Sequence, residues 1–300
     1  MNVSVLEAVE GALQRTRLVL FAPFDLTKWL VLGFCAFLAS LGQGGAWPQF
    51  THHLNGGRGG KSGSSLLDAW VLDNLPWMVF LGLGLLFAAF AIHVVLLWLS
   101  SRGAFLFLDG IVRDRGAVVE PWGEYARAGN SLFLFRLALG LIAFFLVLAV
   151  VAFSLSVGWQ GLRDGDPGPA LVPMVFLLFA VLLPVGIVLW LLSVLAKDFA
   201  VPIMLKRGVG VRRAFGVFFG EVLGGQFLSV VLFYLLKVVI LIAFGVVTAV
   251  GVLCTCCIAA LPYISSVVFL PLLVFMRAYP VTLLEQLGPD WTFFEEPSAA

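Results

Sequence analysis

A single lysine interrupts one of the most apolar stretches of the sequence. Lys237 lies within FYLLKVVI (233–240), near the middle of a segment long enough to cross a membrane. A cation at that depth costs about 2.5–3.5 kcal/mol, so it must face a protein interior or a hydrated cavity. No carboxylate lies mid-span to pair with it. The expected partners are therefore the hydroxyls of Tyr234 and Thr248. Backbone carbonyls freed by Pro184 or Pro271 are further candidates.

His93 is the second titratable side chain predicted within the hydrocarbon region. At about 1.5 Å per residue, Lys237 lies about 20 Å and His93 about 11–13 Å from the predicted inner boundary. A direct contact between them therefore needs helix tilt or a bridging water. We interpret Lys237, His93 and Tyr234 as a candidate intramembrane polar site for an anionic lipid or solute. The alternative is a lysine with a purely structural role.

Other reactive residue types occur without the partners that their chemistry requires. The three cysteines of the C-x-C-C motif (254–257) have no His, Asp or Glu within ten residues. The paired histidines have no nearby third ligand. The glycine-rich loop lacks the first glycine of a phosphate-binding loop. We therefore predict no metal, no cofactor and no enzyme; an intramembrane enzyme would need a carboxylate beside His93. The motifs are Cys254, Cys256 and Cys257, the pair His52 and His53, and the loop 55–65.

Glycine and arginine patterns indicate contacts rather than catalysis. Small residues at every fourth position favour close helix packing within the chain, with dimerisation as the alternative; they are Gly216, Gly220 and Gly224. The cytoplasmic connections interleave cations with apolar residues, and each such cation gains about 1 kcal/mol beside anionic lipid. The candidate anionic-lipid contacts are Arg113, Arg115, Lys206, Arg207, Arg212 and Arg213.

The composition requires a membrane to surround these residues. Of 300 residues, 61% are hydrophobic and 12% charged, and the mean hydropathy is +1.07. Soluble domains carry about 25% charged residues, so a water-soluble globule and a disordered chain are both excluded. The net charge of +1 argues against nucleic-acid binding.

Six segments have the length and apolarity of membrane helices, which predicts an all-α, polytopic membrane protein. Together they make a single integral membrane domain over 1–288, followed by an acidic cytoplasmic tail over 289–300. A short surface helix is predicted over 66–75, ending before Pro76. The predicted spans are 26–43, 76–99, 132–158, 171–196, 226–253 and 261–284.

Lysine and arginine are distributed unevenly among the connections. Twelve lie on one predicted side of the membrane: before 26–43 or in its first turn, between 76–99 and 132–158, and between 171–196 and 226–253. Three lie in the connections on the other side, at Arg58, Lys61 and Arg163. Positive residues stay on the cytoplasmic side. We therefore predict a prokaryotic cytoplasmic (inner) membrane location with both termini in the cytoplasm.

A repeated unit of one interfacial helix and two spans is visible in the sequence. Every second span ends on a basic residue followed by an aromatic one, in Arg102/Phe105, Lys197/Phe199 and Arg277/Tyr279. Amphipathic stretches at 3–21, 115–125 and 207–218 precede the next spans and predict three interfacial helices. This indicates a pseudo-threefold parallel repeat, the alternative being that all positive-inside hairpins look alike.

The segment ALQRTRLVLFAPFDLTKWLVLGFCAFLA (12–39) resembles the opening of an uncharacterised prokaryotic membrane family, with its RTR…PFDLTKW pattern. The overall layout is similar to the membrane domain of some bacterial glycerophosphodiester phosphodiesterases. These resemblances imply a six-helix fold of unknown biochemical function. The chain contains no phosphodiesterase catalytic domain, so that activity is not implied. Independently, Asp25 is predicted to cap the helix that follows it.

These features favour a non-enzymatic membrane scaffold or accessory subunit that binds lipid or a protein partner. The expected partners are the lipid bilayer with its anionic inner-leaflet lipids, and either another membrane protein or a second copy of the chain. The alternative is a transporter of a lipid-like or anionic solute that uses the polar site around Lys237.

Overall fold

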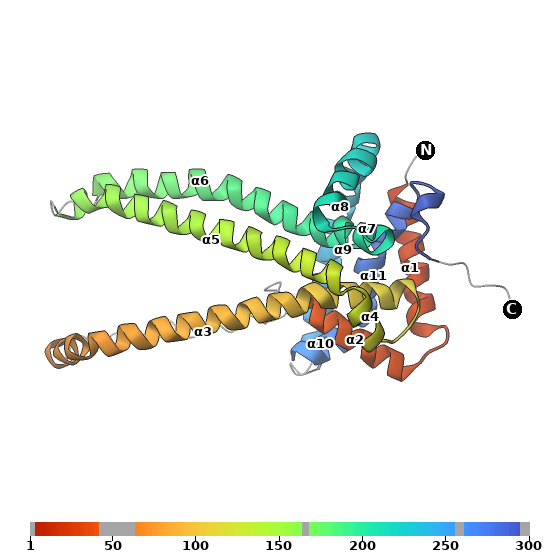
Figure 1. Cartoon of the computed structure of the whole chain (residues 1–300), viewed down its shortest axis with the longest axis horizontal. Coiled ribbons are helices and arrows are strands. Elements are labelled where there is room, and N and C mark those ends of the chain that lie inside the picture. The colour runs from red at the N-terminus through yellow and green to blue at the C-terminus, as the bar shows by residue number, and fades with distance from the viewer. Residues whose placement is uncertain (1–3, 42–63, 164–167, 256–260, 295–300) are drawn as a thin grey trace.

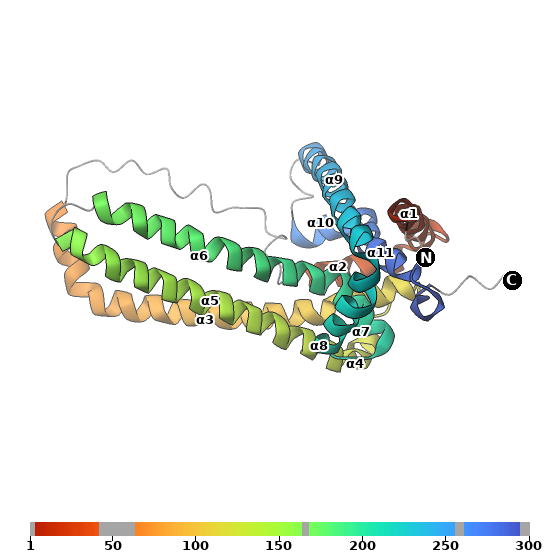
Figure 2. The same cartoon turned by 90° about the horizontal axis from the view of Figure 1, so that it is seen from above.

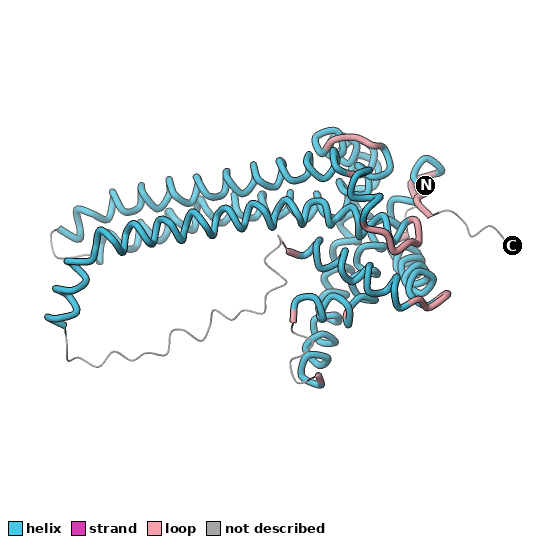
Figure 3. Tube along the Cα trace, turned by 60° about the horizontal axis from the view of Figure 1, so that its bottom comes forward, coloured by secondary structure: helices cyan, strands magenta, loops and turns pink. Residues whose placement is uncertain are grey.

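The computed structural model describes residues 4–41, 64–163, 168–255 and 261–294. Within these ranges the chain is helical and contains no strand (Figure 3). The all-α class follows from the composition, because backbone polar groups surrounded by hydrocarbon must be satisfied within the helix itself.

Four helices are long and apolar enough to cross a membrane: Pro76–Val112, Ala126–Ser154, Phe179–Arg207 and Val211–Cys254. They belong to α3 (Ser64–Val112), α5 (Ala126–Arg163), α6 (Gly168–Leu195) with α7 (Val201–Arg207), and α8 (Val211–Val217) with α9 (Gly224–Cys254). Helices α3, α5 and α6 extend side by side from one end of the molecule, and α9 leaves the same end in another direction (Figures 1 and 2). We call this common end the base.

The base holds the densest packing. It contains α1 (Val5–Phe21), α2 (Leu26–Ser40), α4 (Val119–Glu124), α7, α8, α10 (Pro262–Val268) and α11 (Leu270–Glu285). Phe105, Phe199 and Tyr279, the aromatic residues of the predicted repeat, are each 0% exposed there. The ring of Phe233 stacks on Tyr279 with centroids 4.4 Å apart. Aromatic packing therefore joins helices from distant parts of the chain.

The first and last described helices pack against each other in the base. Small residues make this possible, because Ala8 and Ala12 on α1 are fully buried and α1 lies against α11. The Thr282 hydroxyl donates to the Ala8 carbonyl at 2.8 Å. The Ser4 amide donates to the Gln286 side chain at 2.7 Å. Both described ends of the chain consequently lie at the base.

The start of α2 confirms the cap predicted from the sequence. The Asp25 carboxylate accepts hydrogen bonds from the backbone amides of Thr27 at 2.8 Å and Lys28 at 3.4 Å. These amides have no partner within the helix, so a carboxylate at the N-cap satisfies them.

The structure extends or interrupts several predicted segments. The surface helix predicted over 66–75 does not end before Pro76, since α3 continues through that proline. The segment 261–284 is divided at Phe269 into α10 and α11, with Pro271 in the first turn of α11. Helix α2, with 15 residues, is shorter than a full span. The number of six spans and the threefold repeat stay predictions.

Candidate functional site

Lys237 is paired with a carboxylate. Its Nζ atom lies 2.5 Å from Oδ2 of Asp198, and the Tyr234 hydroxyl donates to the same oxygen at 3.2 Å. Lys237 is 9% exposed and Asp198 3% exposed. The ammonium also lies 5.6 Å from the ring centroid of Phe233. Lys237 and Tyr234 thus both contact Asp198, the carboxylate that sequence reasoning missed.

Asp198 was overlooked because it lies two residues beyond the predicted span 171–196, in the connection that follows it. A π-helical turn over Ala196–Ala200 carries it, between α6 and α7. Such a turn holds one more residue than an α-helical turn and is frequent at functional sites. An aspartate directly after a basic residue at a helix end, as in Lys197-Asp198, is the signal that could have indicated it.

Arg277 ties the same π-helical turn to the rest of the base. Its guanidinium donates to the Lys197 carbonyl at 2.7 Å and to the Ala104 carbonyl at 3.2 Å. The residue is 5% exposed. Helices α3 and α11 and the π-helical turn are therefore joined by one buried cation that binds backbone carbonyls.

His93 lies in a different place from Lys237. It lines a cavity of about 650 Å³ formed by α3, α5 and α6, together with Arg136, Ser193 and Lys197. Arg136 points to two serines within α3, with distances of 3.4 Å to Ser100 Oγ and 3.5 Å to Ser101 Oγ. The structure therefore divides the predicted polar site into a buried ion pair and a separate cavity.

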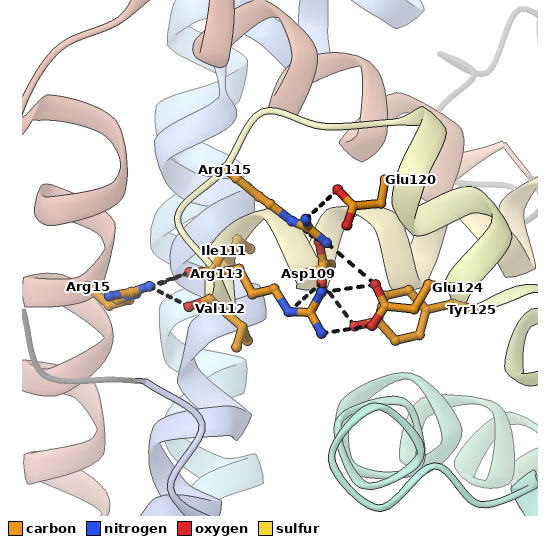
Figure 4. A network of polar contacts seen from close by, with 9 residues as sticks. All are labelled: Arg15, Asp109, Ile111, Val112, Arg113, Arg115, Glu120, Glu124 and Tyr125. Carbon is orange, nitrogen blue, oxygen red and sulfur yellow. Dashed lines mark hydrogen bonds and ion pairs between the residues drawn. The ribbon is translucent and has the colours of Figure 1, made fainter.

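Arg113 and Arg115 hold the end of α3 to α4 (Figure 4). Asp109 is 1% exposed and lies 3.3 Å from Nε of Arg113 and 2.9 Å from Nε of Arg115. Two further carboxylates on α4 complete the network, with Glu124 2.7 Å from Arg113 and Glu120 2.8 Å from Arg115. Three carboxylates balance two arginines, so these two candidate lipid contacts are neutralised within the chain.

Electrostatics in this network follow from burial and pairing. The hydrogen bond from Arg113 lowers the pKa of Glu124 below its ordinary value. Burial, helped by Asp109, raises the pKa of Tyr125, whose hydroxyl donates to Asp109 at 3.0 Å. Tyr125 therefore stays a hydrogen-bond donor to Asp109 inside the base.

Arg15 caps the C-terminal end of α3. It donates to the Ile111 carbonyl at 2.8 Å and the Val112 carbonyl at 2.7 Å, as Figure 4 shows. Burial lowers the pKa of this guanidinium below its ordinary value. A cation is favourable there because the last carbonyls of a helix carry partial negative charge. This residue belongs to the RTR pattern, and its contacts give that arginine a structural role.

The other four candidate lipid contacts divide into two kinds. Arg207 forms an ion pair with Glu221 at 2.5 Å and lies over the Trp291 ring, and Lys206 donates to the Thr292 carbonyl. Arg212 and Arg213, at the start of α8, are exposed. No ion pair or hydrogen bond joins these two side chains to another residue that the structure describes.

The glycine stripe is open rather than packed. A Cβ atom added at Gly216 or Gly220 would meet nothing within 4 Å, and one at Gly224 only the Phe219 carbonyl at 3.6 Å. Close approach occurs elsewhere: a Cβ at Gly103 would lie 2.7 Å from the backbone of Leu38. Gly103 is therefore a packing glycine, at the crossing of α2 and α3.

The cysteine and histidine motifs fall largely outside the described residues. Cys256, Cys257, His52, His53 and 55–63 of the glycine-rich loop lie there. Of the described cysteines, Cys35 is buried and Cys254 exposed, both as free thiols. Among the residues that the structure describes, no group of three His, Cys, Asp or Glu could hold a metal ion.

Four apolar helices of membrane length, built on a helical base, define an all-helical membrane protein. The chain belongs to a family of unknown function, DUF7544, whose model matches residues 3–288. No curated protein and no solved structure matches the chain. The match confirms membership of an uncharacterised family. The likeness to the phosphodiesterase membrane domain and the N-terminal pattern stay predictions.

Proposed function

We propose that the chain is a non-enzymatic scaffold or accessory subunit of a prokaryotic cytoplasmic membrane that binds anionic lipid at its inner face. In this proposal it crosses the membrane six times, both termini are cytoplasmic, and Arg212 and Arg213 lie at the cytoplasmic surface. The unit of one interfacial helix and two spans is used three times. Another membrane protein or a second copy of the chain is its partner.

The surroundings of Lys237 favour the scaffold over the alternative, a transporter. A transporter of an anionic solute would present its intramembrane cation to a cavity. Lys237 is instead paired with Asp198 and lies against Phe233 and Tyr234, and it does not line the cavity that holds His93. Its charge is satisfied within the protein. That cavity also has no Asp or Glu in its lining, which disfavours acid–base chemistry at His93.

Exposed cations at the base support lipid binding. Arg212 and Arg213 follow the αL turn at Gly208 and lie at the polar end of the long helices. Cations near an anionic leaflet gain about 1 kcal/mol each. Arg113 and Arg115, in contrast, are balanced by carboxylates, so they contribute less of this attraction.

The test is lipid retention in native mass spectrometry after gentle extraction. We expect the wild-type protein to retain phosphatidylglycerol over phosphatidylcholine, and R212Q/R213Q to retain severalfold less. The matched control R58Q/K61Q removes the same charge from the connection predicted on the opposite side. Equal loss in both variants, or no preference for anionic lipid in the wild type, would reject the proposal.

A further inference from the structure

The turn between α1 and α2 carries three exposed apolar side chains. Phe21, Phe24 and Leu26 are 52%, 59% and 61% exposed. Phe21 is the last residue of α1 and Leu26 the first of α2, so the three lie within six residues of the chain. Exposed apolar side chains that are grouped in this way mark a surface that another apolar phase covers.

Helix α2 continues this apolar surface along one side. Leu30 and Phe34 follow Leu26 at four-residue spacing and are 41% and 38% exposed, so the three lie on the same side of the helix. This stripe is about 12 Å long at 1.5 Å per residue. Helices α3 and α10 pack against α2. The turn and the stripe therefore form one continuous apolar surface.

The stripe begins level with the charged end of α3 and runs back along that helix. Lys28, near the start of α2, lies 2.6 Å from Asp114, which follows α3. Leu38, near the end of α2, lies against Gly103 within α3. The stretch Pro76–Val112 of α3 has the length and apolarity of a membrane helix. The stripe is thus continuous with a helix that lipid surrounds, and the turn lies at the polar end of that helix.

Polar groups at the turn are satisfied within the chain. The Asp25 carboxylate accepts hydrogen bonds from the amides of Thr27 and Lys28, and the Lys28 ammonium is paired with Asp114. Amides that are hydrogen-bonded and charges that are paired lose less free energy when water is removed from them. The turn can therefore approach lipid without leaving an unpaired group there.

Trp29 supports the two phenylalanine rings from within the chain. Its ring centroid lies 5.5 Å from that of Phe21 and 5.6 Å from that of Phe24. The indole nitrogen donates to the Val267 carbonyl at 3.0 Å, which fixes the indole to the residues around α10. Side chains that are already ordered lose little entropy when they bind. Tryptophan itself is enriched at membrane boundaries.

The size of the surface favours lipid over a protein partner. Five side chains of this size, each about half exposed, offer about 500 Å² at most. A stable protein interface takes about 800 Å² from each partner, so a second copy of the chain would need more surface than this. Lipid requires no minimum area, because apolar side chains enter the boundary between headgroups and acyl chains individually.

We propose that the turn is a wedge that inserts into the cytoplasmic leaflet. Phe21, Phe24 and Leu26 enter the boundary between headgroups and acyl chains, and the stripe along α2 continues the contact into the hydrocarbon. The inference rests on the proposed function, in which 26–43 is the first span and begins at the cytoplasmic side. It deepens that function by adding an apolar contact, which does not select lipid by charge, to the attraction of the exposed arginines of α8.

The test places the photoreactive analogue p-benzoylphenylalanine at Phe24 of the full-length protein in nanodiscs of phosphatidylglycerol and phosphatidylcholine. Irradiation followed by mass spectrometry identifies what the probe contacts. We expect lipid adducts in at least fivefold higher yield than with the same probe at Gln14, an exposed position on α1. The two lipids should react in proportion to their share of the bilayer. An adduct with a second chain, or a yield no higher than at Gln14, overturns the inference.

The same probe at Phe34 keeps the proposal falsifiable if the protein does not fold with the probe at Phe24. Its lipid adducts should lie farther along the acyl chain than those formed at the turn, where the first acyl carbons should react. The absence of lipid adducts at both positions, with the wild type still preferring phosphatidylglycerol, overturns the wedge alone. Lipid adducts at both positions in a protein without that preference overturn the proposed function alone.

Discussion

Asp198 and Lys237 are 39 residues apart in the sequence, and their charged atoms are 2.5 Å apart in the structure. The carboxylate comes from a π-helical turn at the base and the ammonium from α9. The pair therefore joins the one long helix that leaves the base in a separate direction to the three that extend together (Figure 1).

Removing one member of this pair should destabilise the protein. In K237M the Asp198 carboxylate, 3% exposed, is left without its cation, and breaking a buried pair costs about 3–5 kcal/mol. The double variant K237M/D198L removes both charges and should regain most of that loss. Unfolding in detergent, followed by circular dichroism, measures both. A single variant as stable as the wild type would show that the pair contributes nothing.

Asp109 should be the most sensitive carboxylate of the α3–α4 network. D109N removes the buried negative charge, and one of the two acceptor oxygens, shared by Arg113, Arg115 and Tyr125, which should cost about 3–5 kcal/mol. E120Q is the matched control, because Glu120 has a 72% exposed side chain and exposed pairs contribute about 0–1 kcal/mol. Chemical unfolding curves of the two variants test the difference. Equal midpoints would contradict this prediction.

Two glutamates should give the unfolding free energy opposite dependences on pH. The pKa of Glu124 is lowered by Arg113, so its contribution is present above the ordinary value of 4.5 and is lost as the pH falls through its folded pKa. Burial raises the pKa of Glu285, so its neutral form favours folding and stability falls as the pH rises from 4.5 through the folded pKa.

The variants E124Q and E285Q separate these two dependences. E124Q should flatten the stability profile below pH 4.5, and E285Q should flatten the decline above it. Melting temperatures measured across this range provide the check. If E124Q does not change the slope of stability against pH below 4.5, and E285Q does not change it above 4.5, the assigned directions of the two pKa shifts are incorrect.

The crossing of α2 and α3 should not tolerate a side chain at Gly103. A Cβ there would lie 2.7 Å from the Ala39 amide nitrogen and the Leu38 carbonyl carbon, so G103A should cost about 1–3 kcal/mol through overpacking. G140A is the control on α5, where nothing lies within 4 Å, and it should be neutral or stabilising by about 0.5–1 kcal/mol. Thermal unfolding of both proteins measures the contrast. The prediction fails if G103A is the more stable of the two.

Sequence reasoning predicted those features that depend on local composition. The all-α membrane class, the long apolar helices and the Asp25 cap follow from hydropathy and from the type of residue that satisfies free backbone amides. The candidate site was only partly predictable. Tyr234 lies one turn before Lys237 on the same helix, and both bind Asp198.

Features that depend on contacts between distant helices were not predictable. Asp198 follows the predicted span 171–196, and its position in the sequence does not show that it contacts Lys237 on α9. The cavity that holds His93 and Arg136 needs three helices to be placed together. Likewise, a glycine stripe in the sequence does not tell which glycines lie at a crossing; Gly103 does and Gly216 does not.

The contact between α1 and α11 has a consequence for synthesis. The buried face of α1, with Ala8 and Ala12, is covered by α11, whose Thr282 is translated 274 residues after its partner Ala8. Until α11 emerges, α1 can bind the end of α3 through Arg15 but lacks the cover for its apolar face, which should then lie at the lipid headgroups. The contact between α1 and α11 therefore forms only after residues 270–285 have been translated, and chains that stop before 270 should be recognised by membrane quality control.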